Sequence, residues 1–170
     1  DTPVERRERA RVPAGAVVDA NAGGAAVERC VADLEGGSAA FAFASGLAAI
    51  SSVLELLDAG SHIVAGDDMY GGTYRLFERV RRRSAGHAFT YVDLTNPENL
   101  LAALRPETKM VWVETPTNPM LKLADLRAIA DICRARGIIA VADNTFASPL
   151  VQRPLEHGFD IVVHSTTKYL

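Results

Sequence analysis

The chain has 170 residues, 48% of them hydrophobic, and its 18 basic and 21 acidic side chains give a formal net charge of −3. This composition predicts one folded, soluble domain and excludes a disordered segment. Because phosphate neutralisation needs clustered Lys and Arg, the acidic balance disfavours nucleic-acid binding and favours chemistry on a small molecule. Two cysteines, Cys30 and Cys133, are too few for a disulfide framework and favour a reducing, cytoplasmic location.

The sequence predicts no membrane segment. Residues 36–54 carry no charge, but seven of these nineteen residues are Gly or Ser, and Leu and Ile are too few for a span. The first residues, DTPVERRERAR, have no apolar core and therefore do not resemble a secretory signal.

The N-terminal part of the chain differs from the rest. Residues 1–22 are charge-dense and then lack a steady hydrophobic period, which predicts an irregular arm ahead of a domain over residues 23–170. Regular structure begins near Gly24 with a short helix that ends at Gly36-Gly37. Its apolar face repeats at helical spacing over Val27, Cys30, Val31 and Leu34.

Strands and helices then alternate along the remaining sequence. The expected strands are 39–43, 61–65, 88–92, 109–114, 138–143 and 160–163, and the expected helices are 47–57, 74–83, 97–104 and 124–136. Strands that are almost continuously apolar predict an α/β fold with a mostly parallel, doubly wound sheet covered on both faces. Cys133 lies on the apolar stripe of the last helix, so both cysteines are expected in the core.

Polar residues follow the carboxyl ends of several predicted strands, which meet at one edge of a parallel sheet. They are Ser45-Gly46, Tyr70, Glu114, Asn118, Asp143 and residues 165–168. The sequence therefore predicts a functional site at this edge.

A lysine nucleophile can be sought among only three lysines. Lys109 opens a strand at the opposite edge, and Lys122 lies in a connection where it is expected to be solvated. Lys168 follows an apolar strand at the predicted site. A lysine amine in a desolvated pocket forms a Schiff base with a carbonyl, and pyridoxal 5′-phosphate (PLP) is the cofactor that most often uses this chemistry.

PLP also needs an acid facing its ring nitrogen, donors for its phosphate and a flat partner for its ring. Asp143 ends an apolar strand and can supply the acid, and Tyr70 can stack on the ring. The helix that starts at Ser45-Gly46-Leu47 can bind the phosphate together with the hydroxyls of Ser165 and Thr167. Each feature alone has an ordinary structural explanation, such as a helix cap or a turn.

Five segments, taken together, resemble the successive blocks of the Cys/Met-metabolism family of PLP enzymes. They are FAFASGLAAI, VAGDDMYGGTYRLFERV, VWVETPTNPMLKLADL, VADNTFASPLVQRPLEHG and DIVVHSTTKYL. The family includes cystathionine γ-synthases, γ- and β-lyases, methionine γ-lyases and acylhomoserine sulfhydrylases. The resemblance covers roughly residues 26–170 and implies the type I aminotransferase-like large domain.

The resemblance also implies a role for each matching residue. Lys168 would be the Schiff-base lysine and Asp143 the partner of the pyridine nitrogen, and Tyr70 would stack on the ring and transfer protons. The phosphate would be held by Gly46, Leu47, Ser165 and Thr167, with Asn118 and Thr145 around the ring and Arg75 and Glu114 near the substrate.

Two departures from the family pattern predict a fragment. Residues 11–25 lack the Tyr-Ser-Arg and Gly-Asn-Pro-Thr-like segments that the family carries before its first helix. The sheet is expected to be truncated before its closing strand, and the C-terminal domain is expected to be absent. Family members are homotetramers with shared active sites, an assembly that these departures disfavour here.

The tyrosine-containing double-glycine loop and ETPTNPMLKLADL look most like cystathionine γ-lyases and γ-synthases. The expected reaction is γ-elimination of L-cystathionine to cysteine, 2-oxobutanoate and ammonia. One alternative is the γ-replacement that a cystathionine γ-synthase performs on an O-acylhomoserine. Another, from a different class, is an inactive fragment that binds the cofactor weakly or not at all.

Other cofactor and metal motifs are missing from the sequence. No G-x-G-x-x-G follows the first predicted strand, and neither a P-loop nor G-x-S-x-G occurs. His62, His87, His157 and His164 lack metal-ligand spacing and are expected to be ordinary strand or loop residues, so no metal site is predicted.

Overall fold

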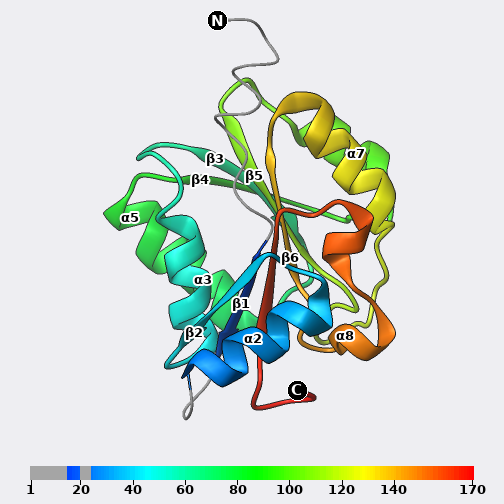
Figure 1. Ribbon diagram of the computed structural model, residues 1–170. Coiled ribbons are helices and arrows are strands. Elements are labelled where there is room, and N and C mark those ends of the chain that lie inside the picture. The colour runs from blue at the N-terminus through cyan, green and yellow to red at the C-terminus, as the bar shows by residue number, and fades with distance from the viewer. Residues whose placement is uncertain (1–14, 20–23) are drawn as a thin grey trace, which may run out of the picture.

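The computed structural model describes residues 15–19 and 24–170. A seven-stranded sheet lies at its centre, and every neighbouring pair of strands is parallel (Figure 1). The strands are β1 (Gly15–Asp19), β2 (Ala39–Phe43), β3 (His62–Gly66), β4 (Ala88–Val92), β5 (Thr108–Glu114), β6 (Ile139–Asp143) and β7 (Ile161–Ser165). Their order across the sheet is β2-β1-β7-β6-β5-β3-β4.

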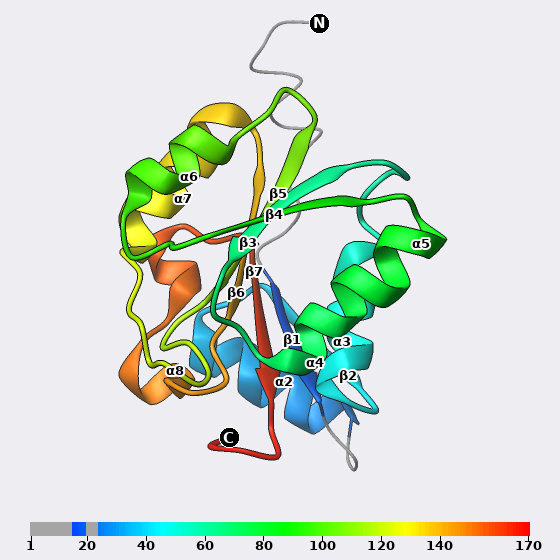
Figure 2. The same ribbon diagram turned by 180° about the vertical axis from the view of Figure 1, so that it is seen from behind.

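The helices connect these strands and cover both faces of the sheet. They are α2 (Gly24–Glu35), α3 (Gly46–Leu54), α4 (Gly71–Arg75), the π-helical segment η1 (Leu76–Arg81), α5 (Arg82–Ser84), α6 (Pro97–Ala103), α7 (Leu126–Arg136), α8 (Ser148–Val151) and the 3-10 turn η2 (Pro154–His157). Figures 1 and 2 show α3 and α5 on one side of the sheet, with α6 and α7 on the other. None of the helices within the described ranges has the length and apolar character needed to cross a membrane.

The alternation of side chains along β5 shows how the two cores form. Met110 and Trp112 pack with Ile50, Leu54 and Phe77 in the cluster beneath α3 and η1. Val111 and Val113 point the other way and pack with Ile129 and Cys133 of α7. Burying each large apolar side chain contributes roughly 1.5–3 kcal/mol to folding, so both faces of β5 fix the sheet.

Helix boundaries follow local chemistry. The side chains of Ser45, Asn96 and Asp125 accept hydrogen bonds from backbone N–H groups at the starts of α3, α6 and α7. Helix α7 ends at Gly137, whose φ of 65° is a left-handed conformation that glycine adopts without a side-chain penalty. The start of α6 at Pro97 and the end of α7 at Gly137 agree with the predicted boundaries, whereas α3 ends at Leu54 before the predicted residue 57 and α7 begins at Leu126, two residues after its predicted start.

Strand β1 corrects the prediction for the N-terminal part. Residues 15–19 were expected inside an irregular arm and form a strand between β2 and β7. This strand joins β2 to β7 in one continuous sheet. The segment forms backbone hydrogen bonds with strands on both sides, and these stabilise it as a strand although its own hydrophobic pattern does not predict one. The rest of the expected arm lies outside the described residues.

The two cysteines also differ from each other. Cys133 is buried in α7, as expected, and burial raises the pKa of its thiol to about 12. Cys30 is exposed, so its expected place in the core is wrong. Helix α2 buries Val31, Ala32 and Glu35 instead, which rotates the packed face away from Cys30. The polar residue Glu35 is therefore inside the protein, where a hydrophobic pattern cannot place it.

Candidate active site

A cavity of about 300 Å³ opens at the carboxyl edge of the sheet. Every residue that the sequence predicts for the site lines this cavity except Arg75, which is exposed on α4. The lining is Ser45, Gly46, Leu47, Ile50, Tyr70, Glu114, Asn118, Asp143, Thr145, Phe146, Val163, Ser165, Thr167 and Lys168. The sequence missed Ile50, Phe146 and Val163, because apolar side chains beside a site look like ordinary core.

Two carboxyl groups form the buried floor of the cavity. Glu114 ends β5 and Asp143 ends β6, and the two residues are partners in the register of these neighbouring strands. The pKa of the Glu114 carboxyl is raised to about 8. Burial is the main cause, and the nearby Asp143 carboxyl contributes to the same shift. Burial also raises the pKa of Asp143 above its usual range, although hydrogen bonds from Thr145 oppose this shift. A cation entering the cavity would stabilise the charged forms of both acids.

Hydrogen bonds fix these two acids in place. The Tyr70 backbone N–H donates to Glu114 Oε2 at 2.8 Å, which joins the loop after β3 to the end of β5. The Thr145 N–H donates to Asp143 Oδ1 at 3.1 Å, and the Thr145 hydroxyl accepts from the Ser165 N–H at 3.0 Å. Asp143 is thus held by the same residue that connects the ends of β6 and β7.

The start of α3 supplies an anion-binding end to the cavity. The Ser45 side chain accepts from the Ala48 N–H at 3.1 Å, and the Ser45 carbonyl accepts from the Ala49 N–H at 3.0 Å. Gly46 and Leu47 precede these positions, so their N–H groups have no carbonyl in an earlier turn of the helix. Both residues line the cavity, where the positive end of the helix dipole adds to their attraction for an anion.

The turn after β7 approaches this helix start closely. An ideal Cβ placed on Gly46 would lie 3.4 Å from the Ser165 Cβ, an ordinary van der Waals distance, so the two residues are direct neighbours. The Ser165 and Thr167 hydroxyls lie 3.1 Å apart beside the helix start. The Lys168 N–H donates to the Ser165 carbonyl at 3.2 Å, which places the lysine on the same turn. Lys168 lines the cavity but is exposed, whereas the sequence argument assumed a desolvated amine.

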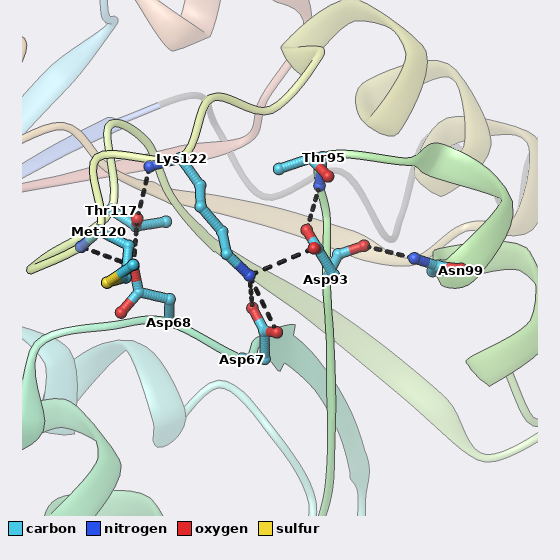
Figure 3. A network of polar contacts seen from close by, with 8 residues as sticks. All are labelled: Asp67, Asp68, Asp93, Thr95, Asn99, Thr117, Met120 and Lys122. Atoms are coloured by element: carbon cyan, nitrogen blue, oxygen red, sulfur yellow. Dashed lines mark hydrogen bonds and ion pairs between the residues drawn. The ribbon is translucent and has the colours of Figure 1, made fainter.

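The other two lysines lie outside the cavity. Lys109 is exposed near the start of β5, as expected. Lys122 is not simply solvated: its Nζ bonds to Asp67 at 3.0 Å and to Asp93 at 3.2 Å (Figure 3). These ion pairs raise the pKa of the Lys122 ammonium, since they favour its charged form. Lys168 is the lysine that the cavity presents to a ligand.

Tyr70 stands at the rim of the cavity with 47% of its surface exposed. Its ring lies against Gly72, where an added Cβ would overlap a carbon of the Tyr70 ring. Glycine at this position therefore allows the ring to occupy its place over the rim. The predicted stacking role of Tyr70 is compatible with this position and stays a prediction.

The residues of the cavity fit PLP. The buried acids suit a ring nitrogen that carries a proton, and the start of α3 with the Ser165 and Thr167 hydroxyls suits a phosphate. Lys168, which lines the same cavity, offers an amine. Within residues 24–170, no group of three or more His, Cys, Asp or Glu side chains could hold a metal ion.

The chain is similar to several known proteins. Over 145 residues the chain is 61% identical to a cystathionine beta-lyase of Coxiella burnetii and 50% identical to a probable cystathionine gamma-synthase of Herpetosiphon aurantiacus. A structure of cystathionine gamma-lyase from Lactobacillus plantarum complexed with L-serine aligns with a TM-score of 0.83 at 51% identity. Each alignment covers 85% of this chain.

The chain spans less than half the length of these relatives. The alignments cover 38% of the Coxiella protein, 45% of the Herpetosiphon protein and 38% of the Lactobacillus chain. The named activities of the relatives also differ, so they agree on cystathionine-related chemistry and not on one reaction. Residues 19–170 match the sequence profile described as Cys/Met metabolism PLP-dependent enzyme, and the chain belongs to this family.

Proposed function

We propose that this chain carries the PLP site of a carbon–sulfur lyase that acts on L-cystathionine. The observation that supports this most strongly is the single cavity lining shared by Lys168, the acids Asp143 and Glu114, and the start of α3. The predicted reaction is γ-elimination, which yields cysteine, 2-oxobutanoate and ammonia.

The roles of the residues follow from their positions. PLP, when bound through its aldehyde, withdraws electrons from the Cα of an amino acid. The Asp143 carboxylate would face the ring nitrogen and favour its protonated form. The N–H groups of Gly46 and Leu47, with the Ser165 and Thr167 hydroxyls, would hold the phosphate.

Proton transfer would fall to Lys168 and Tyr70. The Lys168 amine would take the proton from Cα of the substrate, give that proton up so that it is a free base again, and then take one from Cβ, so that the sulfur on Cγ leaves as a thiolate. Tyr70 at the rim would cover the ring and assist these transfers. Asn118 and Thr145 would contact the ring, and Glu114 would lie near the substrate amine or its leaving group. Arg75 is exposed outside the cavity, so its predicted role would require contact with a part of the substrate that extends beyond the rim.

A second candidate is β-elimination of the same substrate. It is favoured by the 61% identity to a protein named cystathionine beta-lyase. Cleavage at Cβ yields homocysteine, pyruvate and ammonia, whereas cleavage at Cγ yields cysteine and 2-oxobutanoate. The identity of the 2-oxo acid therefore separates the two reactions.

The test begins with cofactor attachment. The purified chain is incubated with PLP, reduced with borohydride and digested, and the modified peptide is identified by mass spectrometry. We expect the label on Lys168 and its loss in Lys168→Ala. Lys122→Ala serves as the matched control, because Lys122 lies outside the cavity, and it should retain the label. Labelling elsewhere, or no labelling, contradicts the assignment of Lys168.

The second step measures turnover. The same preparation receives L-cystathionine, and the 2-oxo acids and thiols are identified by chromatography. We expect 2-oxobutanoate with cysteine; pyruvate with homocysteine would establish the β-lyase instead. An O-acylhomoserine with cysteine tests the γ-synthase. Labelling at Lys168 with none of these products would show that this chain binds the cofactor without performing the reaction.

A further inference from the structure

Glu35 is a buried carboxylate that lies behind the cavity and does not line it. It is the last residue of α2, and its side chain is fully inaccessible to solvent. Its Oε1 accepts a hydrogen bond from His164 Nε2 at 2.5 Å and another from Asn144 Nδ2 at 2.9 Å. These partners are 129 and 109 residues away in the sequence.

The two partners of Glu35 are direct neighbours of site residues. Asn144 follows Asp143, and His164 precedes Ser165 on the strand that leads to Lys168. The Asn144 N–H donates to the Val163 carbonyl at 2.9 Å, so β6 and β7 are already joined by their backbones at this point. Glu35 adds a shared acceptor that fixes the side chains of both strand ends from one helix.

Gln152 extends the same network to the third strand end. Its Nε2 donates to the Thr115 carbonyl at 2.5 Å and to Asn144 Oδ1 at 2.9 Å. Asn144 Nδ2 in turn donates to the Gln152 carbonyl at 2.9 Å. Thr115 follows Glu114, so the network touches the residue next to each acid of the cavity floor.

The burial of these polar groups has a desolvation cost that a purely structural role does not explain. Glu35 Oε2 and His164 Nδ1 are buried and have no hydrogen-bond partner among the described residues. A buried polar pair that leaves hydrogen-bonding atoms unsatisfied commonly stabilises a fold less than apolar side chains of the same volume do. A function in positioning accounts for a carboxylate at the point where two strand ends meet.

We propose that Glu35 is a positioning residue for the PLP site: its Oε1, by binding His164 and Asn144 together, sets the placement of Asp143 relative to the Lys168 turn. This inference rests on the proposed function for the cofactor, but the restraint on the two strand ends is independent of it. What matters is the paired acceptor and not the charge.

Three substitutions of Glu35 separate these possibilities. Glu35→Gln retains an oxygen that accepts both hydrogen bonds and removes the charge. Glu35→Asp retains the carboxyl group, but its side chain is one methylene shorter, so the acceptor oxygens lie farther from His164 and Asn144. Glu35→Leu removes both acceptors at similar volume. Glu28→Leu is the matched control on the same helix, because Glu28 accepts from the Ala42 N–H at 2.9 Å and does not line the cavity.

Two measurements apply to every variant. Hydrogen exchange is followed in peptides covering 143–146 and 163–168, with peptides of β3 and β4 as the internal reference. The dissociation constant for PLP is measured by titration. In Glu35→Leu we expect faster exchange in these two segments only, and PLP affinity weakened by about tenfold or more. Glu35→Asp should show the same effects more weakly, and Glu35→Gln and Glu28→Leu should stay within about threefold of the unsubstituted chain.

Several results would overturn the inference. Unchanged exchange in Glu35→Leu would show that the network does not restrain the strand ends, and equal acceleration throughout the sheet would show a general loss of stability. If Glu35→Leu does not fold, the comparison of Asp with Gln decides, since weaker effects in Asp than in Gln indicate a role for charge. If the unsubstituted chain does not bind PLP, the proposed function fails, while the exchange measurement still tests the restraint.

Discussion

Two polar networks hold the loops around the cavity, and they differ in their exposure to water. Lys122, Asp67 and Asp93 form a partly exposed cluster that joins the loop after β5 to the ends of β3 and β4 (Figure 3). Glu35, His164, Asn144 and Gln152 form a mostly buried network behind β6 and β7. Exposed ion pairs are weakened by water and salt, whereas an unpaired buried polar group pays its full desolvation cost. Hydrogen bonds of similar length should therefore contribute much more to the free energy of unfolding in the buried network than in the exposed one.

The exposed network extends to the site through the Lys122 N–H, which donates to the Thr117 hydroxyl at 2.8 Å. Asp68 accepts hydrogen bonds from the Thr117 hydroxyl and from the Met120 N–H, which brackets Asn118. Tyr70 lies two residues after Asp68. This network therefore orders the outer rim, where Tyr70 and Asn118 lie, while the buried one orders the cavity floor and the Lys168 turn.

The largest effect is expected from Asn144→Leu. This change removes one of the two donors to Glu35 Oε1, the side-chain donor to the Gln152 carbonyl and the acceptor of one Gln152 Nε2 hydrogen bond, while His164 still donates to Glu35. We expect the free energy of unfolding to fall by about 3 kcal/mol, as for other buried networks broken on one side. Urea denaturation followed by circular dichroism measures it. A loss below about 1 kcal/mol would remove the proposed difference between the two networks.

A smaller effect is expected from Glu114→Gln, and it depends on pH. Glu114 has a folded-state pKa of about 8, above its ordinary value of 4.5, so the fold favours its neutral form. Its stabilising contribution is complete below about pH 4.5 and is lost as the pH rises through about 8. The substitution should remove this pH-dependent loss, because the neutral amide of Gln has no charged form to desolvate as the pH rises. Unfolding curves between about pH 5 and pH 8 test this, and parallel slopes in both proteins would contradict it.

Gly72→Ala should change the rim more than the fold. The new Cβ overlaps the Tyr70 ring, which is half-exposed and can rotate away. We expect a stability loss of about 1 kcal/mol or less, but a displaced ring. Tyr70→Phe provides the matched control, since it retains the ring in place. The fluorescence of the PLP-bound chain and the PLP affinity report the ring position, and identical values for Gly72→Ala and the unsubstituted chain would refute the prediction.

The smallest effect on folding is expected from Lys122→Met, which removes the exposed ion pairs and keeps the apolar stem. The unfolding midpoint should shift slightly at low salt and not at high salt, because salt already screens these charges. Hydrogen exchange should rise in residues 117–123 only. A salt-independent shift as large as that of Asn144→Leu would show that exposure does not separate the two networks.

Much of the fold follows from local sequence signals. The spans of β2 and β4 match their predicted ranges, and α7 ends at Gly137 as its glycine predicts. Both signals act over a few residues, through strand alternation or a helix terminator. Strand β1 was missed because its partners are supplied by distant strands. The short α8 and η2 were missed because they are too short to show a hydrophobic period.

The site residues could be predicted for a related reason. In a parallel sheet, a residue at the end of a strand is placed at the functional edge by chain order alone, as for Asp143 and Ser165. The network behind the site gave no such signal. His164 looked like an ordinary strand histidine, and the contact between it and Glu35 joins positions 129 residues apart. Only the folded chain brings their polar atoms together.

The cavity lining combines two carboxyl groups, whose charged forms a cationic guest would stabilise, with the amide-rich start of α3, and this combination has a further consequence. A guest with a positive ring at one end and a negative group at the other meets a matching field in one orientation and an opposing field when reversed. Acid at the strand ends and the amide-rich start of α3 would therefore select the direction of entry before any covalent bond forms. If PLP binds as proposed, the cavity lining itself would favour one orientation of the cofactor before its aldehyde meets the Lys168 amine.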